Sequence, residues 1–276
     1  MRNLPGKRVL ITGAGSGLGR EMALAFSDAG AQVVVTDVNS AGIAVTAELV
    51  QAAGGRAICL PMDVTDVNNV LEVRRQLHQL HGPIDILVNN AGIVRGGGFL
   101  EVPVQAHRNM LEVNALGPVI VTHAFLPDLI AQPEGHCVNI VSASGMIPLP
   151  NCATYAASKW AALGLSDSIR EELRSAGHGH VRVTAVCPGF LDTGLFAGAR
   201  QPRFMPRLET SRLAVQIVRA VEADKNYLLT PWLVKIIPIC KAILPLSLGQ
   251  WIVDWLGVTT MHSLPDQQTH PTTGVA

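Results

Sequence analysis

Short apolar runs alternate with longer amphipathic stretches along most of the chain. Seven of these runs are rich in β-branched residues and are bounded by turn residues, which is typical of buried strands. They are residues 7–12, 31–37, 56–63, 85–90, 136–142, 181–189 and 226–231. Between them apolar residues recur at helical spacing, so that Met22, Ala25, Phe26 and Ala29 share one face. This alternation predicts a parallel sheet with helices on both faces.

The same pattern predicts one α/β domain with a doubly wound, seven-stranded parallel sheet. The domain extends over residues 1–230, and no linker or repeat divides it. Residues 231–260 are a hydrophobic extension that we expect to be short and helical. The polar residues 261–276 are expected to form a disordered tail.

Composition narrows the class of protein. Of the 276 residues, 48% are hydrophobic and 15% charged, which suffices for a large core. The 21 basic and 21 acidic residues cancel, so no net charge attracts the chain to nucleic acid. The five cysteines form no C-x-x-C pair, and we expect reduced thiols. The histidines lack acidic or thiol partners at ligand spacing, so we expect no metal site.

The first predicted strand runs into the sequence TGAGSGLGRE, residues 12–21, and then into a helix. Glycines let a backbone turn tightly and approach a pyrophosphate, and the helix N-terminus offers free N–H groups to the anion. Position 18 is leucine, so the glycines fit T-G-x-x-x-G-x-G rather than G-x-G-x-x-G. We therefore expect a dinucleotide to lie against this turn.

Asp37 ends the second predicted strand. A carboxylate at this place accepts hydrogen bonds from the adenosine ribose of NAD and repels the 2′-phosphate of NADP. The residue therefore favours NAD as the cofactor. The alternative is a carboxylate that only stabilises a turn.

Tyr155 and Lys159 stand four residues apart in the sequence TYAASKW and share a helix face. A tyrosine hydroxyl has a pKa near ~10, which must fall by roughly 3 units for proton transfer near neutrality. A lysine ammonium one turn away and the positive nicotinamide ring of NAD⁺ both stabilise the phenolate. The pair therefore predicts a general acid/base.

The glycine spacing and the Y-x-x-x-K pair together resemble the short-chain dehydrogenase/reductase family, whose members have an NAD(P)-binding Rossmann fold. Five further motifs match the family in order, and the resemblance covers about residues 5–232. It implies that Ser142, Tyr155 and Lys159 are catalytic and that Asn114 organises a proton-relay water. Two alternatives stay open, namely Ser144 in place of Ser142, and a purely structural, helix-bending role for Asn114.

The resemblance also implies a cofactor site built from several strand ends. Asp63 and Val64 would hold the adenine ring, and Thr193 would help to clasp the nicotinamide carboxamide. The implied cofactor-binding residues are Gly13, Ser16, Gly17, Leu18, Gly19, Asp37, Asp63, Val64, Asn90, Ala91, Gly92, Tyr155, Lys159, Pro188, Gly189 and Thr193. Family members that use NADP carry a basic residue where this chain has Ser16 or Val38, which again favours NAD.

The implied reaction moves a hydride between an alcohol and NAD. The alcohol oxygen lies between Ser142 and Tyr155, and Tyr155 removes the hydroxyl proton while Lys159 lowers its pKa. We expect a lipophilic secondary alcohol, or its ketone, as the substrate. The alternatives are an NAD(P)H-dependent carbonyl reductase of another substrate class and a non-catalytic NAD-binding scaffold.

Residues 230–257 are nearly all apolar and include three tryptophans. Two lysines and an aspartate interrupt them, which disfavours a membrane span. Pro231, Pro238 and Pro245 predict short helical turns, each restarted by a proline. Two interpretations stay open: these turns cover the cleft and a neighbouring subunit, or a tryptophan-bearing face enters a lipid interface. The composition loosely resembles the hydroxysteroid and retinol branches of the family, which favours a lipophilic substrate.

The resemblance further implies a homodimer or homotetramer, paired through the helices that carry Asn114 and Tyr155. The first predicted strand begins within ten residues of the start, which leaves no room for an apolar export segment. We expect a cytoplasmic protein, with peripheral membrane contact through residues 231–256 left open.

Overall fold

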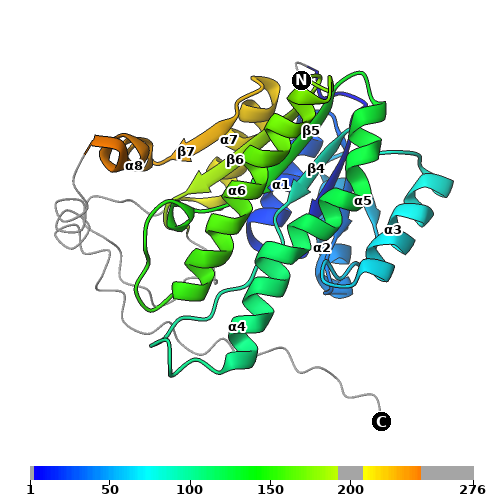
Figure 1. Ribbon diagram of the computed structural model, residues 1–276. Coiled ribbons are helices and arrows are strands. Elements are labelled where there is room, and N and C mark those ends of the chain that lie inside the picture. Colours follow the sequence, from blue (N-terminus) through cyan, green and yellow to red (C-terminus); the bar gives the residue numbers. More distant parts are fainter. Residues whose placement is uncertain (1–2, 192–207, 244–276) are drawn as a thin grey trace, which may run out of the picture.

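A computed structural model describes residues 3–191 and 208–243 of the chain. Seven strands form one parallel sheet, and helices cover both of its faces (Figure 1). The strands are β1 (Arg8–Thr12), β2 (Gln32–Thr36), β3 (Arg56–Cys59), β4 (Ile86–Asn89), β5 (Gly135–Ile140), β6 (Val181–Pro188) and β7 (Tyr227–Thr230). The predicted fold class is confirmed, and the predicted strands differ from these only at their ends.

Most helices connect consecutive strands, as a parallel sheet requires. They are α1 (Gly17–Asp28), α2 (Ser40–Ala52), α3 (Val67–Leu80), α4 (Val104–Leu111), α5 (Gly117–Ala131), α6 (Ala153–Ser175), α7 (Thr210–Glu222) and α8 (Trp232–Ile243). A π-helical turn, η1 (Glu112–Leu116), joins α4 to α5, and a short 3₁₀ turn, η2 (Ala143–Gly145), precedes α6.

Side chains of each strand point alternately to the two faces of the sheet. In β1, Val9 and Ile11 pack with α1, α2 and α7, whereas Leu10 packs with α3 and α5. The central strands are buried on both faces, which explains why most of their residues are apolar and do not alternate with exposed polar ones. On α1, Met22 and Phe26 of the predicted face are fully buried.

The strand order is β3-β2-β1-β4-β5-β6-β7, so the direction of winding reverses between β1 and β4. Neighbouring crossovers leave this point toward opposite faces and open a crevice beyond the carboxyl ends of the two strands. Residues of the predicted cofactor site directly follow both strands: Gly13 follows β1 and Asn90 follows β4.

The extension after β7 departs from the prediction. α8 is one helix that runs through Pro238, so the expectation that each proline restarts a helix is wrong at this position. A proline inside a helix removes one intrahelical hydrogen bond. Val234 is fully buried and packs beside Leu233 and Ile237. Pro245, the other two tryptophans and residues 261–276 lie outside the described residues.

Within the described ranges, one helical stretch, Val104–Ala131, is long and apolar enough to cross a membrane by length and composition. Half of it is buried inside the fold, as in the core helix of a globular domain.

Truncation of a core side chain tests the packing of α1. Phe26 is fully buried against the sheet, so Phe26→Ala should lower the free energy of unfolding by about 3–5 kcal/mol. Urea unfolding followed by circular dichroism measures this. Leu80→Ala is the control, because Leu80 is 73% exposed and should shift stability by less than about 0.5 kcal/mol. Equal effects of the two substitutions would contradict the packing.

Candidate active site

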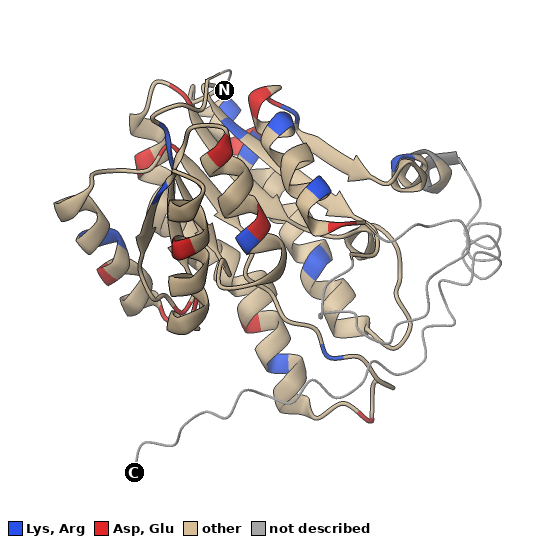
Figure 2. Cartoon of the chain, turned by 180° about the vertical axis from the view of Figure 1, so that it is seen from behind, with Lys and Arg blue, Asp and Glu red and all other residues tan. Residues whose placement is uncertain are grey.

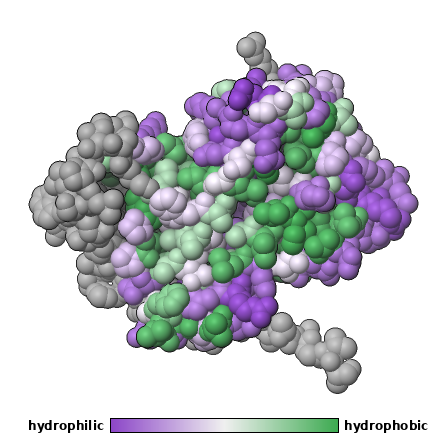
Figure 3. Space-filling model, viewed as in Figure 1, coloured by the Kyte–Doolittle hydropathy of each residue, from purple (hydrophilic) through white to green (hydrophobic). Residues whose placement is uncertain are grey.

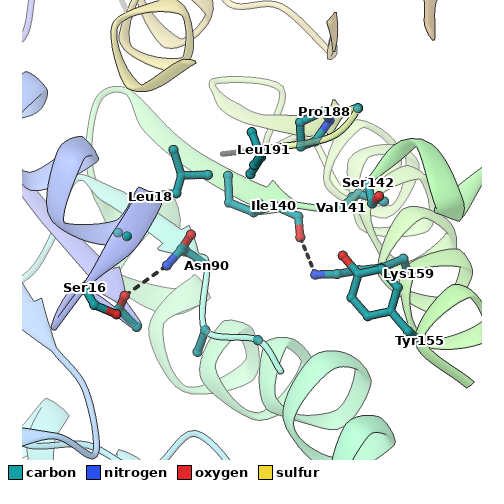
Figure 4. Close-up of a pocket in the computed structure, with 16 residues that line it drawn as sticks. Ser16, Leu18, Asn90, Ile140, Val141, Ser142, Tyr155, Lys159, Pro188 and Leu191 are labelled. Carbon is teal, nitrogen blue, oxygen red and sulfur yellow. Dashed lines mark hydrogen bonds between the residues drawn. The ribbon is translucent and has the colours of Figure 1, made fainter. Parts of the chain in front are cut away.

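A cavity of about 420 Å³ opens at the reversal point of the sheet (Figure 4). It is lined by Gly13, Ser16, Gly17, Leu18, Gly19, Asn90, Ala91, Gly92, Ile140, Val141, Ser142, Tyr155, Lys159, Pro188, Gly189 and Leu191. All of these except Ile140, Val141 and Leu191 belong to the site expected from the sequence. The three others are apolar residues at or just beyond strand ends, and no polar motif marks them.

The turn after β1 has the shape that a pyrophosphate needs. Gly13 has φ +66°, and a Cβ there would lie 2.8 Å from the Cα of Ala91. A Cβ on Gly19 would overlap the carbonyl oxygen of Gly13. Gly17 begins α1 with φ +51°, and its missing Cβ leaves open space. The turn therefore exposes backbone N–H groups at a helix N-terminus, which fits a dinucleotide phosphate.

Asp37 lies beside this turn rather than in the cavity wall. Its Oδ2 accepts a hydrogen bond from the Gly15 backbone N–H (3.0 Å), and its Oδ1 accepts one from Asn39 (2.9 Å). On the other side of Gly15, the Arg20 guanidinium donates to the Gly15 carbonyl and to Thr46. The carboxylate is thus held at the rim of the cofactor turn, where the sequence predicts the adenosine ribose.

Asn90 fastens β4 to the glycine turn. Its amide donates to the carbonyl oxygens of Thr12 (2.9 Å) and Gly13 (3.1 Å). In return, the Thr12 hydroxyl accepts hydrogen bonds from the backbone N–H groups of Asn90 and Ala91. These contacts hold the two ends of the crevice at a fixed separation.

Ser142, Tyr155 and Lys159 meet on the opposite wall of the cavity (Figure 4). The Lys159 ammonium lies 5.8 Å from the centre of the Tyr155 ring and donates to the Ile140 carbonyl (2.9 Å). The Ser144 backbone N–H donates to the Ser142 oxygen (3.2 Å), which leaves the Ser142 proton available for another acceptor. Helix α6 and the end of β5 therefore place a hydroxyl, a phenol and a cation together.

Burial dominates the acid–base properties of this group. It raises the pKa of Tyr155, although a hydrogen bond with Ser142 acts in the opposite direction. It lowers the pKa of Lys159 to about 8. The tyrosine shift is opposite to the expectation from Y-x-x-x-K spacing, because desolvation of the phenolate is the largest effect on this pKa. A positive charge placed in the cavity would act in the other direction.

Asn114 stands outside the cavity, in the π-helical turn η1. Its buried amide exchanges hydrogen bonds with both backbone groups of Ile93 and donates to the Ser158 hydroxyl (3.2 Å). Ser158 in turn donates to the Tyr155 carbonyl (2.7 Å). Asn114 thus connects the segment after β4 to the catalytic helix, which agrees with the structural alternative and leaves the relay role a prediction.

Other expected residues are not gathered at the cavity. The Asp63 carboxylate accepts hydrogen bonds from Thr65, and Val64 is buried against Gly117. Thr193 lies outside the described residues. Ser144, the alternative to Ser142, is buried with no hydrogen-bond partner for its hydroxyl among the described residues and does not line the cavity.

One flank of Tyr155 is an apolar wall. Its ring packs in a cluster with Val94, Leu149 and Cys152, and Phe190 is partly buried against the same cluster. In the described ranges, no three histidine, cysteine or acidic side chains gather as metal ligands, and all five cysteines are free thiols. The site therefore combines polar groups for one oxygen atom with an apolar surface beside it.

Comparisons with known proteins place this geometry in context. The chain is 37% identical to human epidermal retinol dehydrogenase 2, over 97% of this chain and 88% of the relative. It is 32% identical to human retinol dehydrogenase 10, over 93% of this chain and 84% of the relative. A short chain dehydrogenase/reductase from Burkholderia phymatum, solved in complex with NAD, superposes with a TM-score of 0.80 at 27% identity, over 88% of this chain and 95% of that one.

The family model for short chain dehydrogenases matches residues 7–203. This range contains the glycine turn, the Asn90 junction and the buried group of Ser142, Tyr155 and Lys159. The chain is therefore a member of the short-chain dehydrogenase/reductase family of oxidoreductases, with curated relatives among the retinol dehydrogenases.

Proposed function

We propose that the protein is an NAD-dependent dehydrogenase that oxidises a lipophilic alcohol or reduces the corresponding carbonyl compound. The observation that carries this proposal is the meeting of Ser142, Tyr155 and Lys159 opposite the glycine turn, beside an apolar wall. The names of the relatives add retinol, a primary alcohol, to the secondary alcohols expected from the sequence.

The residues divide the work of proton transfer. Ser142 and Tyr155 hydrogen-bond the alcohol oxygen, and Tyr155 accepts its proton. Bound NAD⁺ supplies a hydride acceptor and a positively charged ring. Lys159 is a cation in the buried wall, and it stabilises the phenolate in a region where few water molecules screen the charge. The apolar wall excludes water and holds the hydrocarbon part of the substrate.

The preference for NAD rests on Asp37. Both of its oxygens already accept backbone hydrogen bonds, so the side chain is held in place as an anion at the rim of the turn. A 2′-phosphate there would meet a like charge, which is strongly unfavourable. Val38 is 69% exposed and offers no compensating cation.

Two alternatives remain distinguishable. A carbonyl reductase of another substrate class would use the same residues in the reverse direction. Rates measured with a panel of different alcohols distinguish it from the proposed dehydrogenase. A non-catalytic scaffold would bind NAD but turn over no alcohol. The presence of Ser142, Tyr155 and Lys159 in one cavity favours an enzyme.

We also propose a homo-oligomer in the cytoplasm. Leu111, Leu116, Val119 and Trp160 are exposed apolar residues on α4, η1, α5 and α6, the helices expected to pair across a twofold axis. Their exposure supports a partner on this face. Whether residues 231–256 contact a membrane stays a prediction, because only part of this stretch is described.

Tyr155→Phe tests the general acid/base. Removal of the hydroxyl should lower kcat by at least about 10³-fold while the affinity for NAD is retained. Reduction of NAD⁺ measured by absorbance with a panel of retinol, steroids and long-chain alcohols gives the rates, and calorimetry gives the affinity. The chain has two tyrosines, so Tyr227→Phe is the matched control and should stay active. Substantial activity in Tyr155→Phe would refute the assignment.

Lys159→Met tests the buried cation. A positive charge lowers the pKa of the phenol, so its loss should move the rising limb of kcat/KM for alcohol oxidation to higher pH by about 1–3 units. The ammonium is charged at neutral pH, because its pKa of about 8 lies above neutrality. Lys225→Met, on the exposed turn before β7, should leave the profile in place. An unshifted profile in Lys159→Met would remove the lysine from the mechanism.

The double variant Asp37→Ser with Val38→Arg tests cofactor choice. The native protein should prefer NAD⁺ over NADP⁺ by on the order of 100-fold in kcat/KM, because NADP⁺ meets the Asp37 carboxylate. Replacing the anion by a hydroxyl and adding a cation should reverse the order. Steady-state kinetics with both cofactors measure the ratio. A native protein that uses both equally would show that Asp37 does not read the ribose.

A further inference from the structure

An exposed apolar surface, separate from the helix face proposed for oligomer contact, projects from the end of the molecule that carries α4. Residues 97–104, here named the loop tip, form the last part of the connection from β4 to α4 and include the first residue of α4. Its side chains Phe99, Leu100 and Val104 are 64%, 95% and 76% exposed. The tip protrudes beyond the sheet and the other helices in Figure 1, and hydrophobic side chains gather at the same end in Figure 3.

The loop tip holds its polar groups inward. The Gly98 backbone N–H donates to the Glu101 carboxylate (3.0 Å), and the Gly98 carbonyl accepts from Glu101 (2.8 Å) and Val102 (3.1 Å). The Gly97 backbone N–H donates to the Asn151 carbonyl (2.8 Å). One oxygen of the exposed Glu101 carboxylate is thus held by the backbone of the loop. Entry of Phe99, Leu100 and Val104 into an apolar medium leaves these hydrogen bonds intact as long as the charged carboxylate stays at the aqueous boundary.

His107 fixes the tip to the catalytic helix. Its Nε2 lies 3.1 Å from the Phe99 carbonyl, which can only accept, so this nitrogen donates. Its Nδ1 lies 2.7 Å from the hydroxyl of Thr154, the neighbour of Tyr155 in α6. The Phe99 and His107 rings are also in contact, with centroids 4.8 Å apart. The exposed side chains are therefore presented by a braced loop, which lowers the entropy lost on insertion.

Apolar packing continues from the tip to the active site. Val102, under the tip, belongs to the same buried cluster as Val94, Leu149 and Tyr155. Buried apolar packing therefore joins the tip to the wall that carries the Tyr155 ring. Near the tip, Arg108 of α4 has an exposed side chain that pairs with Glu112 of η1 (3.3 Å), and basic and acidic positions lie close together along these elements (Figure 2). The exposed guanidinium can also contact phosphate head groups.

We propose that the loop tip inserts Phe99, Leu100 and Val104 into a lipid surface, so that the active site takes up its substrate from the membrane. This inference rests on the lipophilic substrate of the proposed function. A second protein chain fits the tip less well, because a stable interface needs about 800 Å² per partner and roughly 20–30 residues. Three side chains on a projecting loop suffice for shallow insertion among lipid chains.

Vesicle flotation of the full chain tests the proposal, with phosphatidylcholine vesicles prepared with and without phosphatidylserine. The single variant Leu100→Ser and the double variant Phe99→Ser/Leu100→Ser should each bind vesicles about tenfold more weakly or worse, because polar side chains do not partition into the lipid. Leu80→Ser is the matched control, since Leu80 is exposed on α3, away from the tip. Leu100→Ser, at a site without core packing, keeps the test valid if the double variant is unstable.

Activity separates this inference from the proposed function. With retinol held in vesicles, the tip variants should lose about tenfold in kcat/KM, and with a short water-soluble alcohol they should match the native rate. Native binding of the variants to vesicles, or no vesicle binding by the native protein, overturns the proposal. A change in sedimentation without a change in flotation identifies a second copy as the occupant and also overturns it. If no alcohol is oxidised, the proposed function fails, whereas the flotation result stands by itself.

Discussion

The hydrogen bonds between Asn90 and the glycine turn hold the site together. Strand order reverses between β1 and β4, so no crossover helix covers the gap between their ends. The Asn90 amide spans that gap to two carbonyl groups, and the Thr12 hydroxyl returns two hydrogen bonds. Without them the phosphate turn and the segment leading to Asn114 would be free to move apart. The glycine turn and the cavity wall that carries Ser142, Tyr155 and Lys159 are therefore held at one edge of the sheet.

Within this edge, burial sets the chemistry. A phenol and an ammonium placed in an apolar wall both resist ionisation, which is why the pKa of Tyr155 rises and that of Lys159 falls. The Lys159 ammonium also donates a hydrogen bond to the Ile140 carbonyl. In the proposed reaction, the positive ring of bound NAD⁺ would therefore help to lower the pKa of Tyr155.

The fold was predictable because its signals are local and repeated. The strands are short runs rich in β-branched residues, and helices such as α1 and α3 have an apolar face, so order and type follow from spacing. The glycine turn and the Tyr155–Lys159 pair were predictable from their spacing, and Ser142 from the resemblance to the family. The pKa direction of Tyr155 was not, because desolvation depends on residues distant in sequence, such as Val94 and Met110. The path of α8 through Pro238 was not either, because the sequence pattern predicts that a proline restarts a helix.

The contacts of Asp37 also limit how the protein can change. One carboxylate faces the predicted ribose and also holds the Gly15 backbone N–H, while Arg20 holds the next carbonyl group of the same glycine. A mutation that alters cofactor choice at Asp37 therefore loosens the phosphate turn at the same time. Adaptation toward NADP must pass through variants with a less ordered glycine turn, unless a second substitution restores the hydrogen bond to Gly15. The proposed preference for NAD is thus tied to the order of this turn.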